Sequence, residues 1–404
     1  MNLLDPSLYE SVRKPLEQAH GLPPACYHDP AFHQKEHEDI FTKGWILAGR
    51  TDRIANPGDY CTVGFGDLSL VLTRSEDGAL QAFANTCRHR GAPLVEGEGH
   101  CRALSCPYHA WTYKLDGTLA AAPGMQDTAN FHMAEFPLHR VRIDVWDGFM
   151  FVCASAQTPP LAQWLGDLPE RLAMYGFDQM RTARRVEYQV ACNWKVWVEN
   201  FMEGYHIPTV HRSTISRQKV VNMPEDPGRG EYVAIYERHE GTRALLHGDA
   251  GFGPIETLSG ESSLGSRFIL IYPNAMLAIA NDTMWCFEAF PQGATQTKIV
   301  LSSCFPASRF ERDDFAALAA NYFKRQDIVV REDNDISEWQ QRGLQNRHAR
   351  PGRFSIKEKI VHALDNWVLD RVLGVTSQDG DALTQPAPTH PQAPVASGVH
   401  RRPA

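Results

Sequence analysis

Two short segments, each with one cysteine and one histidine, constrain the fold of this chain more than any other feature. The first contains Cys87 and His89, and the second, sixteen residues further on, contains Cys106 and His109. Both lie in a stretch where short apolar runs alternate with Asn-Pro-Gly and Asp-Gly turn signals, a pattern that predicts β-hairpins. Thiolates and imidazoles at two hairpin tips are typical metal ligands. The chain is therefore expected to fold with these two tips facing one another.

This ligand set is that of a Rieske [2Fe–2S] cluster, in which two cysteines hold one iron and two histidines hold the other. The imidazole ligands raise the reduction potential to roughly −150 to +300 mV, so that the cluster accepts electrons from a donor of lower potential. A structural zinc site of the Cys2His2 type uses the same ligands. Zinc fingers, however, keep their two cysteines together and their two histidines together, whereas each segment here mixes them. We therefore interpret the four residues as cluster ligands.

A second group of candidate ligands follows the pattern E-x2-H-x4-H and consists of Glu203, His206 and His211. On an unbroken helix, side chains five residues apart point about 140° away from each other, so the two histidines can share a metal only if the helix is interrupted. Pro208 predicts this interruption, because it biases Ile207 away from the helical region and breaks the turn. Two histidines with one carboxylate form the facial triad of non-haem Fe(II) enzymes, which leaves open positions for dioxygen.

The carboxylate of the triad has to come from another part of the chain. A long helical pattern from about residue 312 to residue 344 offers three acids, Glu332, Asp333 and Asp335. The helical neighbours of Asp333 are mostly apolar, so this acid faces the core and needs a partner there. Asp335 shares its face with charged residues that water can reach, whereas the apolar neighbours of Glu332 do not exclude it. Periodicity alone leaves the choice open.

The two cysteine–histidine segments, together with the Arg-Gly-Ala-Pro-Leu and Ala-Trp residues that follow them, resemble the cluster loops of Rieske ring-hydroxylating and demethylating oxygenases. The resemblance covers roughly residues 25–345. It implies that Asp333 is the third iron ligand, with Asp335 as second choice, because the family's third ligand precedes a segment similar to Trp-Gln-Gln-Arg-Gly-Leu here. The cofactors implied are a [2Fe–2S] cluster and a mononuclear non-haem Fe(II).

The same resemblance implies a ring-shaped homotrimer in which the cluster of one subunit feeds the iron of its neighbour. Glu203 is then expected to bridge His109 and His206 across the subunit boundary. We interpret Glu203 and Asn200 as catalytic residues beside the iron. Many relatives carry aspartate at the position of Glu203, which weakens aromatic dioxygenases as near relatives of this chain.

The fold class implied is α+β, with a small all-β Rieske domain joined to a catalytic domain of helix-grip form, an antiparallel sheet with a long helix. The sequence patterns agree, because short β-rich runs are followed by a mixture of helices and antiparallel strands. Residues 375–404 are rich in Pro, Ala, Gln and His and cannot bury enough apolar surface to offset the entropy of ordering. The expected segments are an N-terminal helical arm (1–44), the Rieske domain (45–155), the catalytic mononuclear iron domain (156–374) and a disordered tail (375–404).

Composition and charge limit the kinds of partner that this chain is expected to have. The net charge is −8 and no run is rich in Lys or Arg, which argues against nucleic acid. No segment approaches the roughly 20 apolar residues of a membrane span, and the first residues do not form a signal peptide, so a cytoplasmic location is expected. No G-x-G-x-x-G lies between a predicted strand and a predicted helix. Electrons are therefore expected from a separate NAD(P)H-dependent reductase, directly or through a ferredoxin.

The sequence thus predicts the oxygenase component of a multicomponent enzyme that uses dioxygen to hydroxylate or oxidatively demethylate a small molecule, with monooxygenation favoured. The motif around Glu203 is similar to that of enzymes acting on betaine-like quaternary amines, and also to that of enzymes acting on aromatic acids. The alternatives are a cis-dihydroxylating dioxygenase of aromatic rings, a Rieske electron carrier without catalysis, and a helix-grip ligand-binding module. Six aromatic residues are candidates for the substrate pocket: Trp197, Phe201, Tyr205, Tyr272, Trp285 and Phe287.

Overall fold

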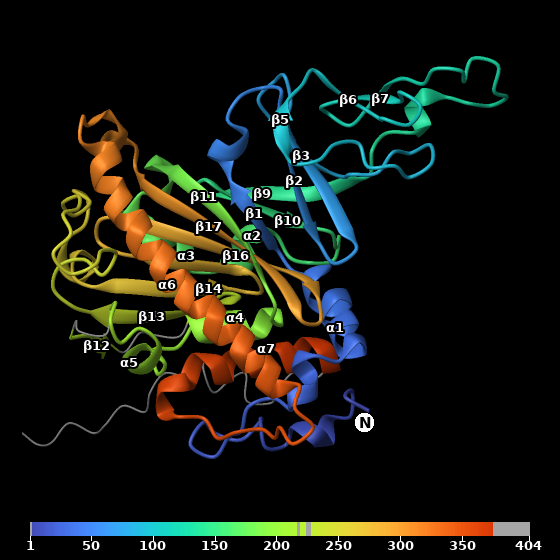
Figure 1. Cartoon of the computed structure of the whole chain (residues 1–404). Coiled ribbons are helices and arrows are strands. Elements are labelled where there is room, and N and C mark those ends of the chain that lie inside the picture. Colours follow the sequence, from blue (N-terminus) through green and yellow to red (C-terminus); the bar gives the residue numbers. More distant parts are fainter. Residues whose placement is uncertain (1, 216–218, 224–227, 375–404) are drawn as a thin grey trace, which may run out of the picture.

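The computed structural model describes residues 2–215, 219–223 and 228–374. Two seven-stranded antiparallel sheets dominate it, and a long helix crosses a face of the second sheet (Figure 1). The predicted disordered tail, residues 375–404, lies outside the described residues. No helix within the described part of the chain is long and apolar enough to cross a membrane.

The first sheet has the strand order β1-β10-β9-β4-β3-β2-β5. Strand β2 alternates between buried and partly exposed positions, because one of its faces lies on the core, whereas β1 and β10 are buried throughout. The β9–β10 hairpin turns through Asp147 and Gly148, which both have positive φ, as the tightest hairpin turns require. The strands are β1 Ile46–Arg50, β2 Asp59–Phe65, β3 Leu68–Arg74, β4 Leu80–Ala84, β5 Glu98–His100, β9 Arg140–Trp146 and β10 Phe149–Cys153.

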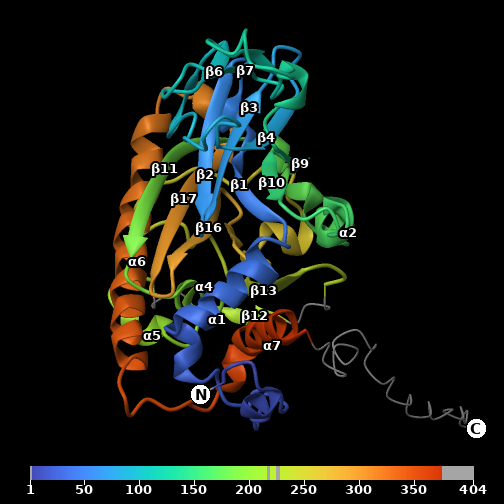
Figure 2. The same cartoon turned by 90° about the vertical axis from the view of Figure 1, so that its right-hand side faces the viewer.

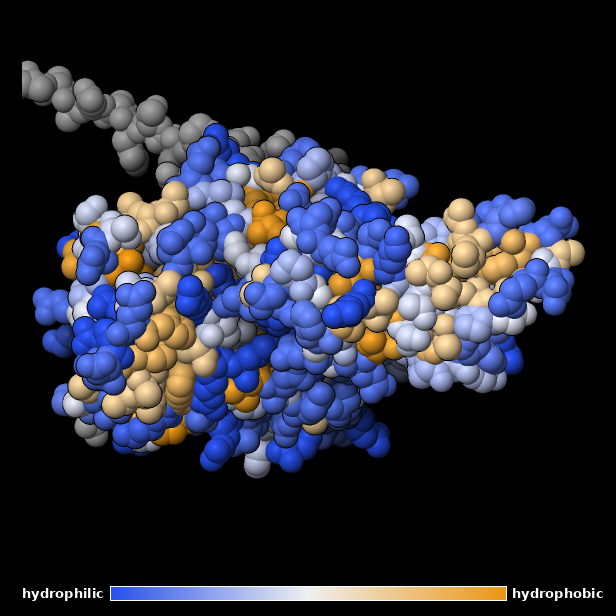
Figure 3. Space-filling view, turned by 90° about the horizontal axis from the view of Figure 1, so that it is seen from above, coloured by the Kyte–Doolittle hydropathy of each residue, from blue (hydrophilic) through white to orange (hydrophobic). Residues whose placement is uncertain are grey.

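A small three-stranded sheet, β6 Ala103–Ser105, β7 Thr112–Lys114 and β8 Leu119–Ala121, extends from the end of the first sheet. It has its own apolar core, which includes Leu104 and Tyr113. Seen from above, this lobe projects from the rest of the molecule (Figure 3). The two cysteine–histidine segments lie here, one between β4 and β5 and the other between β6 and β7.

The second sheet has the order β11-β17-β16-β15-β14-β13-β12. From β12 to β17, each strand pairs with the next one along the chain, and β11 closes the row beside β17. Strands β16 and β17 form a long antiparallel pair, as expected from the antiparallel strands predicted for this part of the chain. The strands are β11 Met180–Val190, β12 Val221–Met223, β13 Tyr232–Arg238, β14 Ser266–Ile271, β15 Ala275–Ile279, β16 Met284–Gly293 and β17 Gln296–Pro306.

The long helix α6, Phe315–Leu344, lies along the second sheet in both side views (Figures 1 and 2). Its buried residues recur at spacings of three and four, as at Ala319, Tyr322 and Gln326, so that one face of the helix covers the sheet. This arrangement confirms the predicted α+β class. The other α-helices are α1 Pro30–Glu36, α2 Leu161–Leu165, α3 Leu168–Leu172, α4 Trp194–Phe201, α5 Ile207–Val210 and α7 Lys359–Leu373.

A fully buried ion pair attaches the N-terminal segment to α4. The Lys195 Nζ lies 2.5 Å from Glu36 Oε1, and neither side chain is exposed. The same Nζ donates hydrogen bonds to the Cys26 carbonyl at 3.0 Å and to Asn193 Oδ1 at 2.9 Å. Because a buried charge needs such partners, this contact fixes α4 in position. Helix α4 leads directly into the second group of candidate ligands.

Candidate metal centres and active site

The two cysteine–histidine segments form loops of the same shape. In each loop, the residue four positions after the cysteine donates its N–H to the cysteine carbonyl, from Gly91 to Cys87 at 2.9 Å and from Ala110 to Cys106 at 3.0 Å. Gly91 and Ala110 both have positive φ. Alanine seldom adopts this conformation, so its presence here indicates that the surrounding contacts impose the loop shape.

The loops bring the candidate cluster ligands together. The rings of His89 and His109 lie 4.7 Å apart, and Cys87 and Cys106 are buried and unpaired. The Nδ1 atom of His109 is buried and has no hydrogen-bond partner among the described residues. Desolvation, followed by the proximity of His89 and Arg90, lowers the pKa of His109 and so favours the neutral ring. A buried, unpartnered nitrogen on a neutral ring is explained if it binds a metal.

These four residues do not converge on a single point. In the described part of the chain, only one group of His, Cys, Asp or Glu residues brings three ligand atoms within 4.8 Å of one another, and it contains none of the four. A tetrahedral zinc ion, with bonds of about 2.0–2.3 Å, requires all four ligand atoms within about 4 Å of each other. A two-iron cluster holds its cysteines and histidines as separate pairs. The geometry therefore fits the cluster and not the zinc site.

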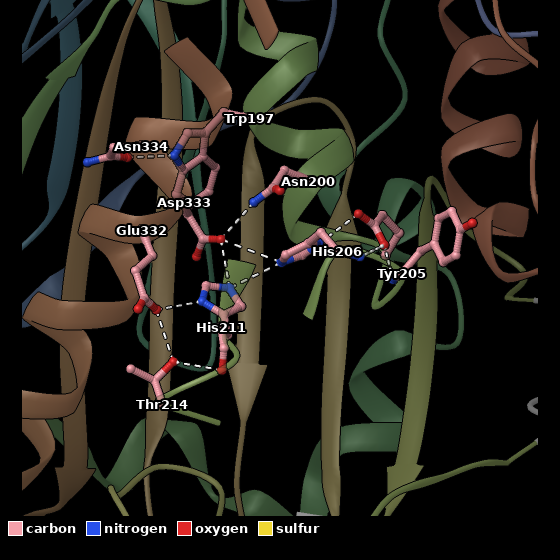
Figure 4. A network of polar contacts seen from close by, with 10 residues as sticks. Trp197, Asn200, Tyr205, His206, His211, Thr214, Glu332, Asp333 and Asn334 are labelled. Atoms are coloured by element: carbon pink, nitrogen blue, oxygen red, sulfur yellow. Dashed lines mark hydrogen bonds and ion pairs between the residues drawn. The ribbon is translucent and has the colours of Figure 1, made fainter. Parts of the chain in front are cut away.

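The group that does converge consists of His206, His211 and Asp333. The His211 Nε2 lies 3.2 Å from His206 Nε2 and 3.0 Å from Asp333 Oδ1, and His206 Nε2 lies 3.6 Å from the same oxygen. Asn200 donates a hydrogen bond from Nδ2 to this oxygen at 2.9 Å. Figure 4 shows the three side chains pointing toward one another from α5 and α6.

The two ring nitrogens that face away from this point are each held by a carboxylate. Glu203 Oε1 lies 2.7 Å from His206 Nδ1, and Glu332 Oε2 lies 2.7 Å from His211 Nδ1. A carboxylate accepts a hydrogen bond from the N–H at Nδ1, so in the neutral ring the Nε2 atom carries an electron pair. Two such electron pairs and a carboxylate that face one point repel each other unless a proton or a metal cation lies between them. The residues therefore fit a divalent metal ion with oriented ligands.

Burial disfavours the charged form of His211, but hydrogen bonds and charge from Asp333 and Glu332 outweigh this effect and raise the pKa of the ring. Glu332 is further fixed by a hydrogen bond from Thr214 Oγ1 at 3.0 Å. Asp335, two residues further along α6 than Asp333, is exposed. Asp333 is thus the acid of this helix that lies with the two histidines, while Glu332 orients one of them.

The local path of the chain differs from the one predicted. Helix α4 ends at Phe201, and the interruption falls at residues 202–206, ahead of Pro208. Ile207 is helical, and Pro208 lies in the first turn of α5, where a missing N–H is tolerated. The prediction that Pro208 breaks the turn is therefore wrong. His206 and His211 flank α5 as its N-cap and C-cap, and His211 leaves the helical region with φ −98° and ψ 28°.

A cavity of about 100 Å³ opens beside the three ligands. Four of the six aromatic candidates line it, namely Trp197, Phe201, Trp285 and Phe287. The other two do not, because Tyr205 is 57% exposed and Tyr272 is buried with its ring 4.4 Å from that of Trp367. The cavity wall also contains three charged residues that were not predicted from the sequence, Glu237, Arg243 and Arg325. Only Arg325 could have been found from the sequence, because it lies eight residues before Asp333 and therefore on the same face of the predicted helix.

Comparisons with known proteins agree with both centres. Residues 44–136 match the family described as "Rieske [2Fe-2S] domain", and residues 177–374 match "Ring hydroxylating alpha subunit (catalytic domain)". Choline monooxygenase of Arabidopsis thaliana is 31% identical over 86% of this chain and 82% of its own length. The chain belongs to the Rieske ring-hydroxylating oxygenase family. It is an oxidoreductase of the Rieske non-haem iron type, and the electron carrier and the ligand-binding module are set aside.

Three further similarities concern one relative and two solved structures. The glycine betaine monooxygenase oxygenase subunit of Chromohalobacter salexigens is 29% identical over 90% of this chain and 88% of its own length. The crystal structure of the quaternary ammonium Rieske monooxygenase CntA with γ-butyrobetaine has a TM-score of 0.74 at 25% identity and covers 90% of this chain and 98% of that one. Naphthalene 1,2-dioxygenase from Rhodococcus shares the fold, with a TM-score of 0.74 at 17% identity over 93% of this chain and 100% of that one.

Proposed function

We propose that this chain is the oxygenase component of a monooxygenase that acts on a small quaternary amine and receives electrons from a separate NAD(P)H-dependent reductase or ferredoxin. The observation that carries the proposal is the meeting of His206, His211 and Asp333 at the wall of an aromatic cavity. The identity to choline and glycine betaine monooxygenases supports the substrate class. Aromatic ring dihydroxylation is not favoured, because naphthalene dioxygenase shares only the fold.

The reaction consumes one substrate C–H bond, one dioxygen, two electrons and two protons, and yields one C–OH group and one water. When the cation is an N-methyl compound, the N-hydroxymethyl product releases formaldehyde and a proton and leaves the amine. When bound, the iron would supply the site of dioxygen activation, and the [2Fe–2S] cluster would supply one of the two electrons. The protein supplies orientation, a dry cavity and access for substrate.

The residues around the iron site have distinct tasks in this proposal. Glu203 and Glu332 fix the orientation and the protonated nitrogen of the two imidazoles. Asn200 holds one oxygen of Asp333, so we assign Asn200 to positioning. The Glu203 carboxylate also accepts hydrogen bonds from the backbone N–H groups of Tyr205 and His206. These bonds hold the carboxylate in place, although residues 203–206 are not helical.

The aromatic wall suits a trimethylammonium group. The rings of Trp197, Phe201 and Phe287 contact one another at centroid distances of 5.2 to 5.9 Å. Ring faces attract a cation that has lost its water, by about 2 kcal/mol when desolvated. Apolar rings also exclude water from the site. A quaternary amine, which cannot donate hydrogen bonds, is suited to such a surface.

We further propose that the enzyme is a homotrimer in which the cluster of one subunit serves the iron site of the next. In Figures 1 and 2, the cluster lobe with β6 and β7 and the iron-site helix α5 lie at opposite ends of the folded molecule. Tyr108 on the lobe is 55% exposed, and Tyr205, next to Glu203, is 57% exposed. Exposed aromatic residues at both ends suit an interface. Glu203 would then bridge the cluster of one subunit and the iron site of the next. A cytoplasmic location also remains a prediction.

The test uses purified protein with both metal centres, a surrogate reductase and ¹⁸O₂. Oxygen consumption is measured with choline, glycine betaine, γ-butyrobetaine and benzoate. We expect turnover with at least one quaternary amine, and one labelled oxygen atom in its hydroxylated product or in the released formaldehyde. Turnover of benzoate alone, or two labelled atoms in the product, would contradict the proposal.

A further inference from the structure

The cavity beside the iron site contains a buried cation that the proposed reaction does not use. Arg325, on α6, lines the cavity and is 7% exposed. It has no hydrogen-bond or salt-bridge partner among the described residues, and its Nε is buried. Its guanidinium carbon lies 4.5 Å from the ring centroid of Trp285. Since an unpaired buried charge is strongly unfavourable, its presence in a ligand cavity calls for a partner that arrives from outside.

A second arginine lies at the same end of the cavity. Arg243 is 6% exposed and forms a salt bridge with Glu237, which also lines the cavity. Burial, followed by the charge of Arg243, lowers the pKa of Arg325 to about 9, so Arg325 remains charged at neutral pH. Burial and Arg243 also lower the pKa of the nearby His239 to about 4, so His239 adds no charge. The charges of Asp333 and Glu332 act in the opposite direction on the pKa of Arg325, but these acids pair with the two histidines and Glu237 pairs with Arg243. Arg325 is therefore the cation of this group that has no ion-pair partner among the described residues.

We propose that Arg325, with Arg243 beside it, receives a carboxylate of the substrate. This inference rests on the proposed function and narrows it, because among quaternary amines it selects zwitterions such as betaines over a simple cation such as choline. An arginine binds a carboxylate through two parallel hydrogen bonds, which gives strength and direction. Without a carboxylate, the unpaired arginine repels a trimethylammonium group from the same cavity.

Helix α6 carries both the arginine that would bind the carboxylate end of such a substrate and an iron ligand near its other end. Arg325, Val329 and Asp333 recur every four residues, and all three line the cavity. The eight-residue step from Arg325 to Asp333 places their backbone positions about 12 Å apart along the helix axis. The anionic group therefore binds at one end of the cavity while the carbon to be oxidised lies at the other, near the iron ligands.

The test measures binding by calorimetry on the full-length enzyme with both metal centres. Glycine betaine and the longer γ-butyrobetaine carry both charges, choline carries only the cation, and 3,3-dimethylbutyrate carries only the carboxylate. We expect at least one zwitterion to bind tenfold or more tightly than choline. Arg325→Gln should weaken zwitterion binding by about 10- to 100-fold and leave choline binding unchanged or tighter. Equal binding of choline and both zwitterions, or unchanged zwitterion binding in the variant, overturns the inference.

A second readout separates a binding role from a structural one. If Arg325 is held for a ligand, Arg325→Gln removes an unpaired buried charge, and the melting temperature of the ligand-free enzyme should rise. A fall in melting temperature together with weaker binding of all four compounds shows a structural arginine and overturns the inference. Arg325→Lys keeps the charge and should retain part of the zwitterion preference. Arg331→Gln, at an exposed position of α6, is the control and should change neither readout.

The compound with only a carboxylate distinguishes this inference from the proposed function. If 3,3-dimethylbutyrate binds as tightly as glycine betaine and Arg325→Gln abolishes both, the carboxylate site stands and recognition of quaternary amines fails. If choline binds as tightly as glycine betaine and 3,3-dimethylbutyrate does not bind, the quaternary amine function stands and the carboxylate site fails.

Discussion

Asp333 and Asp335 are two residues apart on one helix and therefore point about 200° apart. The first lies within 3.0 Å of a histidine nitrogen, and the second is exposed. Helix periodicity favoured Asp333 over Asp335, because apolar neighbours mark the buried face, but the choice among the acids of this helix needed the family resemblance. It could not assign Glu332, whose contact with His211 depends on the position of α5 in space. The residue pattern of α6 alone cannot predict a contact that depends on where α5 lies.

The first prediction concerns these two acids. Asp333→Ala removes a ligand from the iron site, so mononuclear iron content should fall and product formation should drop by more than about 100-fold, since even an outer partner of a ligand is worth about 10–100-fold. The absorption spectrum of the [2Fe–2S] cluster should stay unchanged. Asp335→Ala is the matched control and should keep both iron and turnover. Loss of iron in the control with full iron in Asp333→Ala would show that the wrong acid was assigned.

At the scale of elements, α4 positions Asn200 and leads to the iron ligands, and its own position depends on the buried pair of Lys195 and Glu36. The pair connects this helix to α1, so the N-terminal segment packs against the helix that leads to the iron ligands. Removing one member leaves the other charge buried and unpaired, which is more damaging than removing both.

The second prediction follows from this asymmetry. Glu36→Ala should lower the free energy of unfolding by about 3–5 kcal/mol, whereas the double variant Glu36→Leu with Lys195→Met should lose much less. Thermal and denaturant unfolding measure both. Arg312→Ala disrupts the exposed pair with Asp314 and should change stability by at most about 1 kcal/mol. Equal losses in the single and double variants would mean that the charges do not depend on each other.

Elements differ in how well local patterns predict them. The helix predicted at about 312–344 is observed as Phe315–Leu344, because a long periodic pattern averages over local exceptions. The segment around Pro208 was predicted wrongly, because proline is compatible with the first turn of a helix as well as with its end. Composition cannot separate these two cases; they depend on where the preceding helix stops.

At the scale of the whole molecule, the cluster lobe and α5 lie at opposite ends (Figures 1 and 2). If neighbouring subunits exchange electrons, the carboxylate of Glu203 is the contact that both centres share. Turn signals predicted hairpins, but the pairing of distant strands such as β11 and β17 and the separation of the two ends were not predictable, since they depend on how remote parts of the chain pack.

The third prediction tests that contact. Glu203→Gln keeps the size of the side chain and removes its charge, so the imidazole of His206 and the neighbouring cluster lose a shared acceptor. In the variant loaded with both metal centres, the chemically reduced cluster should reoxidise at least about tenfold more slowly when substrate and oxygen are added. Stopped-flow absorbance follows this reoxidation, and iron content serves as the control. A wild-type rate in a fully loaded variant would rule out the relay.

Helix α6 carries both Asp333 and Arg325, which has a consequence for how substrate length can change. Side chains return to one helix face only after three or four residues, so an anion-binding residue can be relocated along the cavity only in steps of about 5.4 Å, one helical turn. Inserting a single residue would rotate it out of the cavity by about 100°. Relatives built on the same helix are therefore expected to accept substrates in discrete length classes, separated by about four carbon–carbon bonds, rather than in a continuous series.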